Sequence, residues 1–148
     1  MAVAKFKSFS NITNIIPQIG PNCKGDYRLR VLVCGSRHFE DIQFVVDTLS
    51  DMFDNQFGNK VSCVIHGDAH GVDKMADSFA YFCKVPVEAY PADWKKHGKA
   101  AGPIRNKQML DDGKPDLVIA FLAPDSRGTK NMIEQATKAN IPVKVINI

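Results

Sequence analysis

The sequence has no long hydrophobic run. Its longest unbroken apolar stretch, Leu117 to Ala123, is seven residues long, whereas a membrane-spanning helix needs about 20. The N-terminus carries scattered lysines but lacks the apolar core of a signal peptide, which makes export unexpected. We therefore expect a cytoplasmic protein with no membrane partner.

The sequence also lacks paired cysteine motifs. It contains four cysteines, and no two of them form a CxxC pair. Zinc sites and disulfide frameworks use characteristic spacings that are missing here. Three of the four, Cys34, Cys63 and Cys83, fall in apolar stretches, where buried free thiols are expected.

An excess of charge is absent from most of the chain. Residues 29–148 contain 15 basic and 15 acidic side chains, and the net charge of +3 comes from residues 1–28. A domain that grips a nucleic-acid backbone usually carries a basic excess, so nucleic acid is an unlikely partner, although a local basic patch is compatible with this balance. Whether residues 1–28 form an arm, an added strand or a tail is left open.

What the sequence does contain is an alternation of strands and helices. Hydrophobic residues make up 45% of the 148 residues and charged residues 24%, as in a soluble single-domain protein. Apolar residues recur from Ile42 and again from Val72 at the spacing of one helix face. Two further helices are expected near Ile104 to Leu110 and Thr129 to Ala139. The predicted strands span residues 29–34, 61–66, 85–90, 116–122 and 142–148.

This alternation predicts a Rossmann-like α/β domain over residues 29–148. Strands that are apolar at most positions are covered on both faces, which is typical of parallel sheets. Right-handed crossovers then place helices on both sides. We expect a three-layer fold with a five-stranded parallel sheet in the order 3-2-1-4-5.

The order 3-2-1-4-5 would bring together the loops after strands one and four. Ligands of open parallel sheets bind in the crevice at such a switch point. Gly128 and Thr129 would open a helix whose free amides attract an anion. Alternatively, Thr129 is an N-cap and Gly128 a turn residue. The donor-rich Gly35, Ser36 and Arg37 in the other loop shift the balance towards an anion site.

The loop after strand two offers a second group of candidates. His66, Gly67 and Asp73 belong to the run HGDAHGVD, which matches no dedicated metal signature. We therefore expect neither a metal nor a cofactor. Asp73 lies in the first turn of a helix, where it would complement the dipole or accept ribose hydroxyls.

The segment PADWKKHGKAAGPIRNKQML adds Trp94, Arg105 and Asn106. These residue types suit stacking on a base and holding a polar ligand. Trp94 is equally explained as a half-buried packing residue. Arg105 and Asn106 are expected near a helix start, where side chains are exposed by default.

The motifs GSRHF, HGDAHGVDKMA, YPADW and KAAGPIRNKQML, followed by DLVIAFL before a GT-containing loop, occur in one order. Together they resemble the YspA-like, YpsA-related branch of the SLOG superfamily, from about Arg30 to Ile148. This resemblance implies a nucleotide or a nucleotide-derived small molecule as ligand. Arg105 resembles the arginine that the related lonely-guy phosphoribohydrolases place against their substrate.

One departure bears on catalysis. The lonely-guy enzymes carry PGGxGTxxE, whereas here Asp125 and Ser126 replace the double glycine and Met132 replaces the glutamate. We therefore expect a protein that binds the nucleotide-like ligand and thereby senses, sequesters or processes it. Whether the ligand is turned over is left open. The first alternative is an N-glycosidic hydrolase of nucleoside 5′-monophosphates that uses carboxylates between Asp68 and Asp73. The second is single-stranded DNA binding, and a homo-oligomer is compatible with the sequence.

Overall fold

The computed structural model describes residues 28–58 and 60–148 of the chain. Five strands form one sheet in the order β3-β2-β1-β4-β5, and each neighbouring pair is parallel. The predicted order and the Rossmann-like α/β class are thereby confirmed. The strands are β1 (Leu29–Gly35), β2 (Val61–His66), β3 (Val87–Ala89), β4 (Leu117–Leu122) and β5 (Val143–Asn147).

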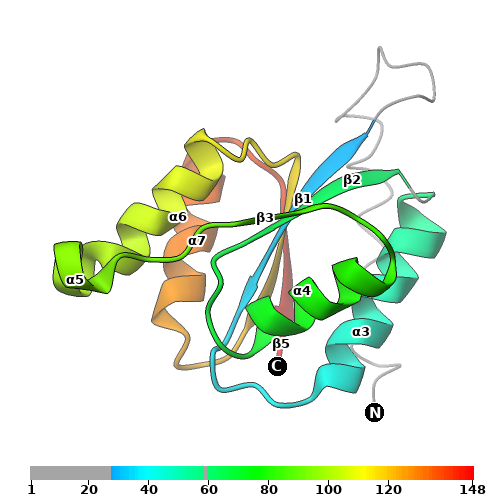
Figure 1. Cartoon of the computed structure of the whole chain (residues 1–148), viewed down its shortest axis with the longest axis horizontal. Coiled ribbons are helices and arrows are strands. Elements are labelled where there is room, and N and C mark those ends of the chain that lie inside the picture. The colour runs from blue at the N-terminus through cyan, green and yellow to red at the C-terminus, as the bar shows by residue number, and fades with distance from the viewer. Residues whose placement is uncertain (1–27, 59) are drawn as a thin grey trace.

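Helices cover the sheet on both sides (Figure 1). α3 (Ile42–Asp51) and α4 (Val72–Phe82) lie on one face, and α6 (Ala101–Asp111) and α7 (Arg127–Lys138) on the other. A π-helical segment (Met52–Gln56) extends α3. The short α5 (Trp94–His97) and a 3₁₀ turn (Gly98–Ala100) lead into α6.

The two cores follow the alternation of side chains along the strands. Val31 and Val33 of β1 pack into the cluster under α3 and α4. Leu32 and Cys34 point the other way, into the cluster with Met109 of α6. Successive side chains of a strand project to opposite faces, so the stretch of β1 from Val31 to Cys34 needs apolar residues at every position. This explains why its sequence reads as a continuous hydrophobic run.

Two expectations, on the third helix and on the cysteines, differ from the structure. The third helix begins at Ala101 rather than near Ile104, because Pro103 occupies its first turn, where no intrahelical N–H bond is lost. Cys34, Cys63 and Cys83 are all free thiols, but only Cys34 and Cys63 are buried. Cys83 is exposed, since α4 ends at Phe82 and Cys83 is its C-cap. The N-terminal extension, apart from Arg28, lies outside the described residues, as does Cys23. Within the described ranges, no helix combines the length and apolar character needed to cross a bilayer.

The topology positions a crevice at the carboxyl ends of β1 and β4. These strands are neighbours, with Gly35 at the end of β1 opposite Phe121 of β4. The chain leaves β1 towards α3 on one face and leaves β4 towards α7 on the other. Crossovers that diverge in this way leave an opening above the strand ends.

Candidate functional site

A cavity of about 470 Å³ lies at this opening. The loop after β1 and the loop before α7 both line it, as the predicted topology requires, together with residues of α4, α5 and α6. It therefore combines segments that lie far apart in the sequence, between Cys34 and Asn131. Nine of the eleven candidate residues lie along its wall: Gly35, Ser36, Arg37, Asp73, Trp94, Arg105, Asn106, Gly128 and Thr129.

The loop after β1 presents a cation to the cavity. Ser36 is buried, and its hydroxyl accepts a hydrogen bond from the His38 amide at 3.1 Å. This turn leaves Arg37 exposed, with its guanidinium carbon 5.9 Å from the centroid of the Trp94 ring. Such a distance allows a cation–π interaction. Trp94 is 50% exposed, which agrees both with a half-buried packing residue and with a ring on which a ligand stacks.

The N-terminus of α7 is uncapped. Ser126 occupies the N-cap position, yet its side chain makes no capping hydrogen bond. Its hydroxyl is buried and has no partner among the described residues. A serine at this position normally accepts a bond from the second or third amide of the helix. Those amides belong to Gly128 and Thr129, and the first-turn N–H groups have no partner within a helix.

Ser126 lines the cavity but is not among the eleven candidates. A serine directly before a helix is an N-cap signal. Ser126 is not recognised as one in the sequence because the helix is expected to begin at Thr129, three residues later. The structure begins it at Arg127. The alternative interpretation of this loop is therefore wrong in both parts: Thr129 is not the N-cap, and Gly128 is not a turn residue but lies within α7.

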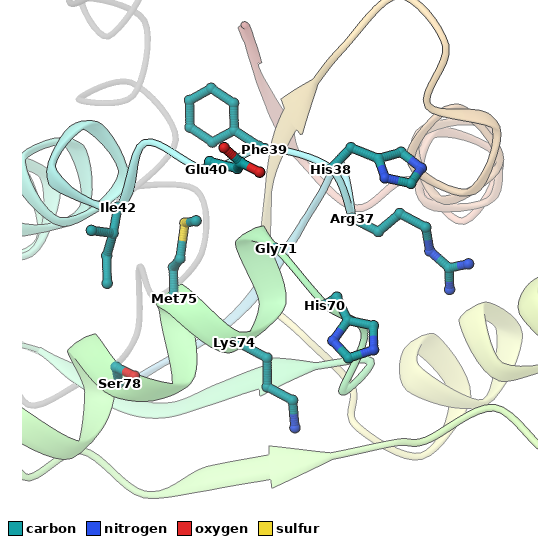
Figure 2. A pocket seen from close by; sticks show the side chains of 10 residues that line it. All are labelled: Arg37, His38, Phe39, Glu40, Ile42, His70, Gly71, Lys74, Met75 and Ser78. Carbon is teal, nitrogen blue, oxygen red and sulfur yellow. The ribbon is translucent and has the colours of Figure 1, made fainter.

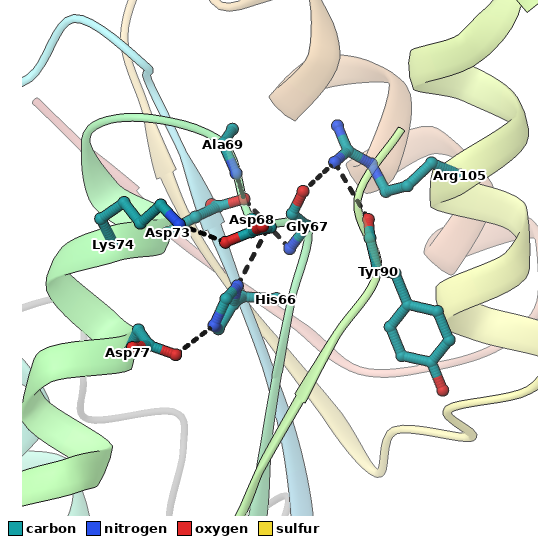
Figure 3. A network of polar contacts seen from close by, with 9 residues as sticks. All are labelled: His66, Gly67, Asp68, Ala69, Asp73, Lys74, Asp77, Tyr90 and Arg105. Atoms are coloured by element: carbon teal, nitrogen blue, oxygen red, sulfur yellow. Dashed lines mark hydrogen bonds and ion pairs between the residues drawn. The ribbon is translucent and has the colours of Figure 1, made fainter. Parts of the chain in front are cut away.

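Arg105 crosses from α6 to the loop after β2 (Figure 3). Its Nη1 donates a short hydrogen bond to the Gly67 carbonyl and a longer one, 3.4 Å, to the Tyr90 carbonyl. Burial lowers the pKa of Arg105, and the carboxyl of Asp73 opposes that shift. A β-carbon at Gly67 would lie 2.6 Å from the Arg105 guanidinium carbon. Glycine is therefore required at position 67 for the arginine to approach.

Asn106 ties α6 to α7. It is 4% exposed, and its Nδ2 donates to the Gly128 carbonyl and to Asn131 Oδ1, both at 3.1 Å. Its own Oδ1 accepts from Arg105 Nε at 3.0 Å. The expectation that Arg105 and Asn106 are exposed is wrong because α6 starts earlier than predicted. They lie in its second turn, facing the loops.

Asp73 holds the loop after β2. Its Oδ2 accepts hydrogen bonds from the amides of Gly67 (3.1 Å) and Ala69 (3.2 Å), and the residue is 4% exposed. Burial raises the pKa of this carboxyl, even though both amide bonds favour its charged form. Among the described residues none donates to Oδ1, and Asp73 lines the cavity.

His66 and Gly67 are not among the cavity-lining residues. His66 is fully buried, with its Nε2 2.8 Å from Asp77 Oδ1 and its Nδ1 accepting from the Asp68 amide at 3.0 Å (Figure 3). The proton of the neutral ring therefore resides on Nε2. This arrangement gives His66 a structural role, and ligand contact by His66 or Gly67 stays a prediction. Residues 28–58 and 60–148 contain no metal-binding cluster of three or more His, Cys, Asp or Glu side chains.

The raised pKa of Asp73 predicts how stability depends on pH. The folded protein binds this proton more tightly than the unfolded chain, whose carboxyl titrates near pH 3.9. The stability that the folded protein gains from binding this proton is fully present below the pKa of the carboxyl in the unfolded chain. It is lost as the pH rises through the pKa of the carboxyl in the folded protein. Asp73→Asn keeps an acceptor for the two amides but does not titrate. We therefore expect the wild type to lose stability relative to this variant on going from about pH 4 to about pH 8.

Urea unfolding of both proteins across that range measures the difference. Other titrating groups are common to the two proteins and cancel in the comparison. A difference in unfolding free energy that does not change with pH would contradict the buried, proton-retaining state of Asp73.

The fold and cavity define a Rossmann-like α/β protein with a polar crevice at the switch point of its sheet. Comparison with known proteins gives its family. The model of the YspA, cpYpsA-related SLOG family matches residues 29–97. The chain is also 40% identical over 119 residues to the Gene 61 protein of Mycobacterium phage D29, covering 77% of this chain and 93% of the phage protein. The chain belongs to the YspA, cpYpsA-related SLOG family.

Proposed function

We propose that this protein binds a nucleotide or a nucleotide-derived small molecule in the cavity, with a phosphate at the N-terminus of α7. The observation that carries the proposal is the uncapped helix, with the buried hydroxyl of Ser126 that has no partner within the part of the chain that the structure describes. Free amides and the positive end of the helix dipole stabilise an anion at such a position. Membership of a SLOG family supports a nucleotide-related ligand.

The charges around the cavity support an anionic ligand. Although residues 29–148 have no net charge, the cavity wall has two more cationic than acidic side chains. Burial also raises the pKa of Asp73. The cations are Arg37, Lys99, Arg105 and Arg127, and the acids are Asp73 and Asp125.

The rest of the cavity suits the other parts of a nucleotide. Trp94 offers a half-exposed indole ring on which a base can stack. Oδ1 of Asp73 accepts no hydrogen bond from residues 28–58 and 60–148, so it can accept one from a ribose hydroxyl. A volume of about 470 Å³ lies in the range of small-molecule sites.

The proposal covers binding and not turnover. The position at which lonely-guy enzymes carry their glutamate is Met132, which is fully buried in the core under α6 and α7. A carboxylate is therefore missing at that point of α7. The thiol of Cys34, at the base of the cavity, is also unsuited to attack a substrate, because burial raises its pKa and keeps it protonated.

Gly128→Asp tests the proposal by placing a negative charge at the anion position. A β-carbon at Gly128 would meet nothing within 4 Å, so the side chain fits. An acidic residue in the first turn favours the helix by about 0.3–1 kcal/mol. We expect unchanged or slightly higher thermal stability but at least tenfold weaker binding of nucleoside 5′-monophosphates, measured by calorimetric titration.

Gly128→Asn is the matched control, since it has nearly the same shape without the charge, and it should bind within about threefold of the wild type. Nucleosides, which lack the phosphate, should bind the wild type at least tenfold more weakly than their monophosphates. The proposal is wrong if no monophosphate gives a signal at millimolar concentration, or if Gly128→Asp and Gly128→Asn bind equally well.

A further inference from the structure

The structure has a second hollow, whose lining residues are shown in Figure 2. Its volume is about 560 Å³, close to that of the first. Arg37 and His38 line both spaces. The two hollows therefore meet at the loop after β1.

The ridge between them is a tight contact of two loops. The Val72 amide donates to the Ser36 carbonyl at 3.2 Å. A β-carbon at Gly71 would lie 2.8 Å from the carbonyl carbon of Arg37. The chain beside this contact contributes Ala69 and Asp73 to the first cavity, and His70 and Lys74 to the second hollow. Arg37 lines both spaces, so it can contact a group that extends from one into the other.

The second hollow has two kinds of wall. Figure 2 shows Arg37, His70 and Lys74 along one side and the apolar Ile42 and Met75 along the other. Ile42 is 49% exposed, so much of its side chain is open to a ligand in the hollow. A flat ring with a polar edge, such as a nucleobase on its sugar, fits between an apolar wall and an imidazole.

Arg37 is the cation available to a linking phosphate. Lys74 is already paired with Asp68. In residues 28–58 and 60–148, by contrast, no acidic side chain forms an ion pair with Arg37. An exposed guanidinium of this kind can bind a phosphate through two hydrogen bonds.

We propose that the ligand is a dinucleotide, in which two nucleoside-sized halves joined through phosphate occupy the two hollows and the linking phosphate binds Arg37. This inference rests on the proposed function, because the first half occupies the cavity described above. A mononucleotide would fill that cavity alone and leave the second hollow, which is of similar size, empty.

The test compares one-part and two-part ligands on the full chain. The probes are AMP, GMP, CMP and UMP, and the matching dinucleotides with 3′–5′ phosphodiester or pyrophosphate links. We expect at least one dinucleotide to bind tenfold or more tightly than its mononucleotide. His70→Ala should remove most of that gain while leaving mononucleotide binding within twofold.

His97→Ala is the matched control, since it makes the same change at a residue outside both hollows, and it should alter neither affinity. As a second variant, Ser78→Glu places a negative charge on the exposed surface of α4 that lines the second hollow. It should weaken dinucleotide binding at least fivefold more than Ser78→Gln does.

The outcomes separate this inference from the proposed function. The dinucleotide proposal is wrong if mononucleotides bind but no dinucleotide binds more tightly. It is also wrong if His70→Ala weakens the binding of both ligand types equally. In both cases the proposed function stands. If neither type of ligand binds at millimolar concentration, both are wrong.

Discussion

Replacing Gly71 with alanine should lower the free energy of unfolding by about 4 kcal/mol or more, a loss at the far end of the range for single substitutions. Gly71 precedes α4 with φ +77° and ψ −127°, a backbone conformation that costs a residue with a side chain about 1–3 kcal/mol. In addition, a β-carbon there would clash with the Ser36 carbonyl oxygen and the Arg37 backbone. Chemical denaturation of the two proteins measures the loss.

Gly98→Ala separates the two causes. Gly98 has a similar backbone conformation, with φ +56° and ψ −135°, but nothing lies within 4 Å of its β-carbon position. It should show the backbone cost alone, about 1–3 kcal/mol. Equal losses for Gly71→Ala and Gly98→Ala would mean that the contact between the two loops gives way easily, contrary to the geometry of the ridge.

Arg105→Met should weaken nucleoside monophosphate binding at least a hundredfold. The change removes a cation from the cavity wall and leaves the buried Gly67 carbonyl without its donor. Truncating one member of a buried, charged hydrogen-bonded pair typically costs 2–5 kcal/mol in binding, and a hundredfold corresponds to about 2.7 kcal/mol. The orphaned carbonyl should also cost about 1–3 kcal/mol of stability.

Two further variants make this result specific. Arg105→Lys keeps the charge without the planar guanidinium, so its binding should lie between those of the wild type and Arg105→Met. Lys107→Met removes a cation from the same helix, where Lys107 is exposed and paired with Asp111, and should leave binding unchanged. Calorimetric titration at one salt concentration measures all of them. Binding by Arg105→Met within twofold of the wild type would remove Arg105 from the site.

The fold could be predicted because its signals are local and periodic. The strands were apolar at consecutive positions, and the helices carried stripes at the spacing of one face. With right-handed crossovers, few arrangements of five such units remain. The third helix was misplaced for the same local reason, since Gly102 and Pro103 resemble a loop when read alone. In the structure they lie in the first turn of α6.

The contents of the site were only partly predictable. The residues of the two loops could be placed by topology, because strand order determines which loops meet. The environment of Arg105 could not, since its closest acceptor is the carbonyl of Gly67, 38 residues earlier in the chain. Backbone carbonyls have no residue-specific signal in a sequence. The second hollow was missed because one of its two walls comes from Phe39, Ile42 and Met75, apolar residues that individually resemble core.

The hydrogen bonds that Arg105 and Asn106 make with their neighbours determine how far the cavity side chains must become ordered when a ligand binds. Asn106 is held to the first turn of α7, and Arg105 is held to the loop after β2, by the protein's own carbonyl groups. Because Arg105 and Asn106 are already ordered, binding a ligand between them restricts few further side-chain rotamers. The entropic penalty of binding at these two residues is therefore small. Arg37 has no such hydrogen bond among the described residues, so the cost of immobilisation falls on exposed side chains of the cavity wall such as Arg37, Lys99 and Arg127.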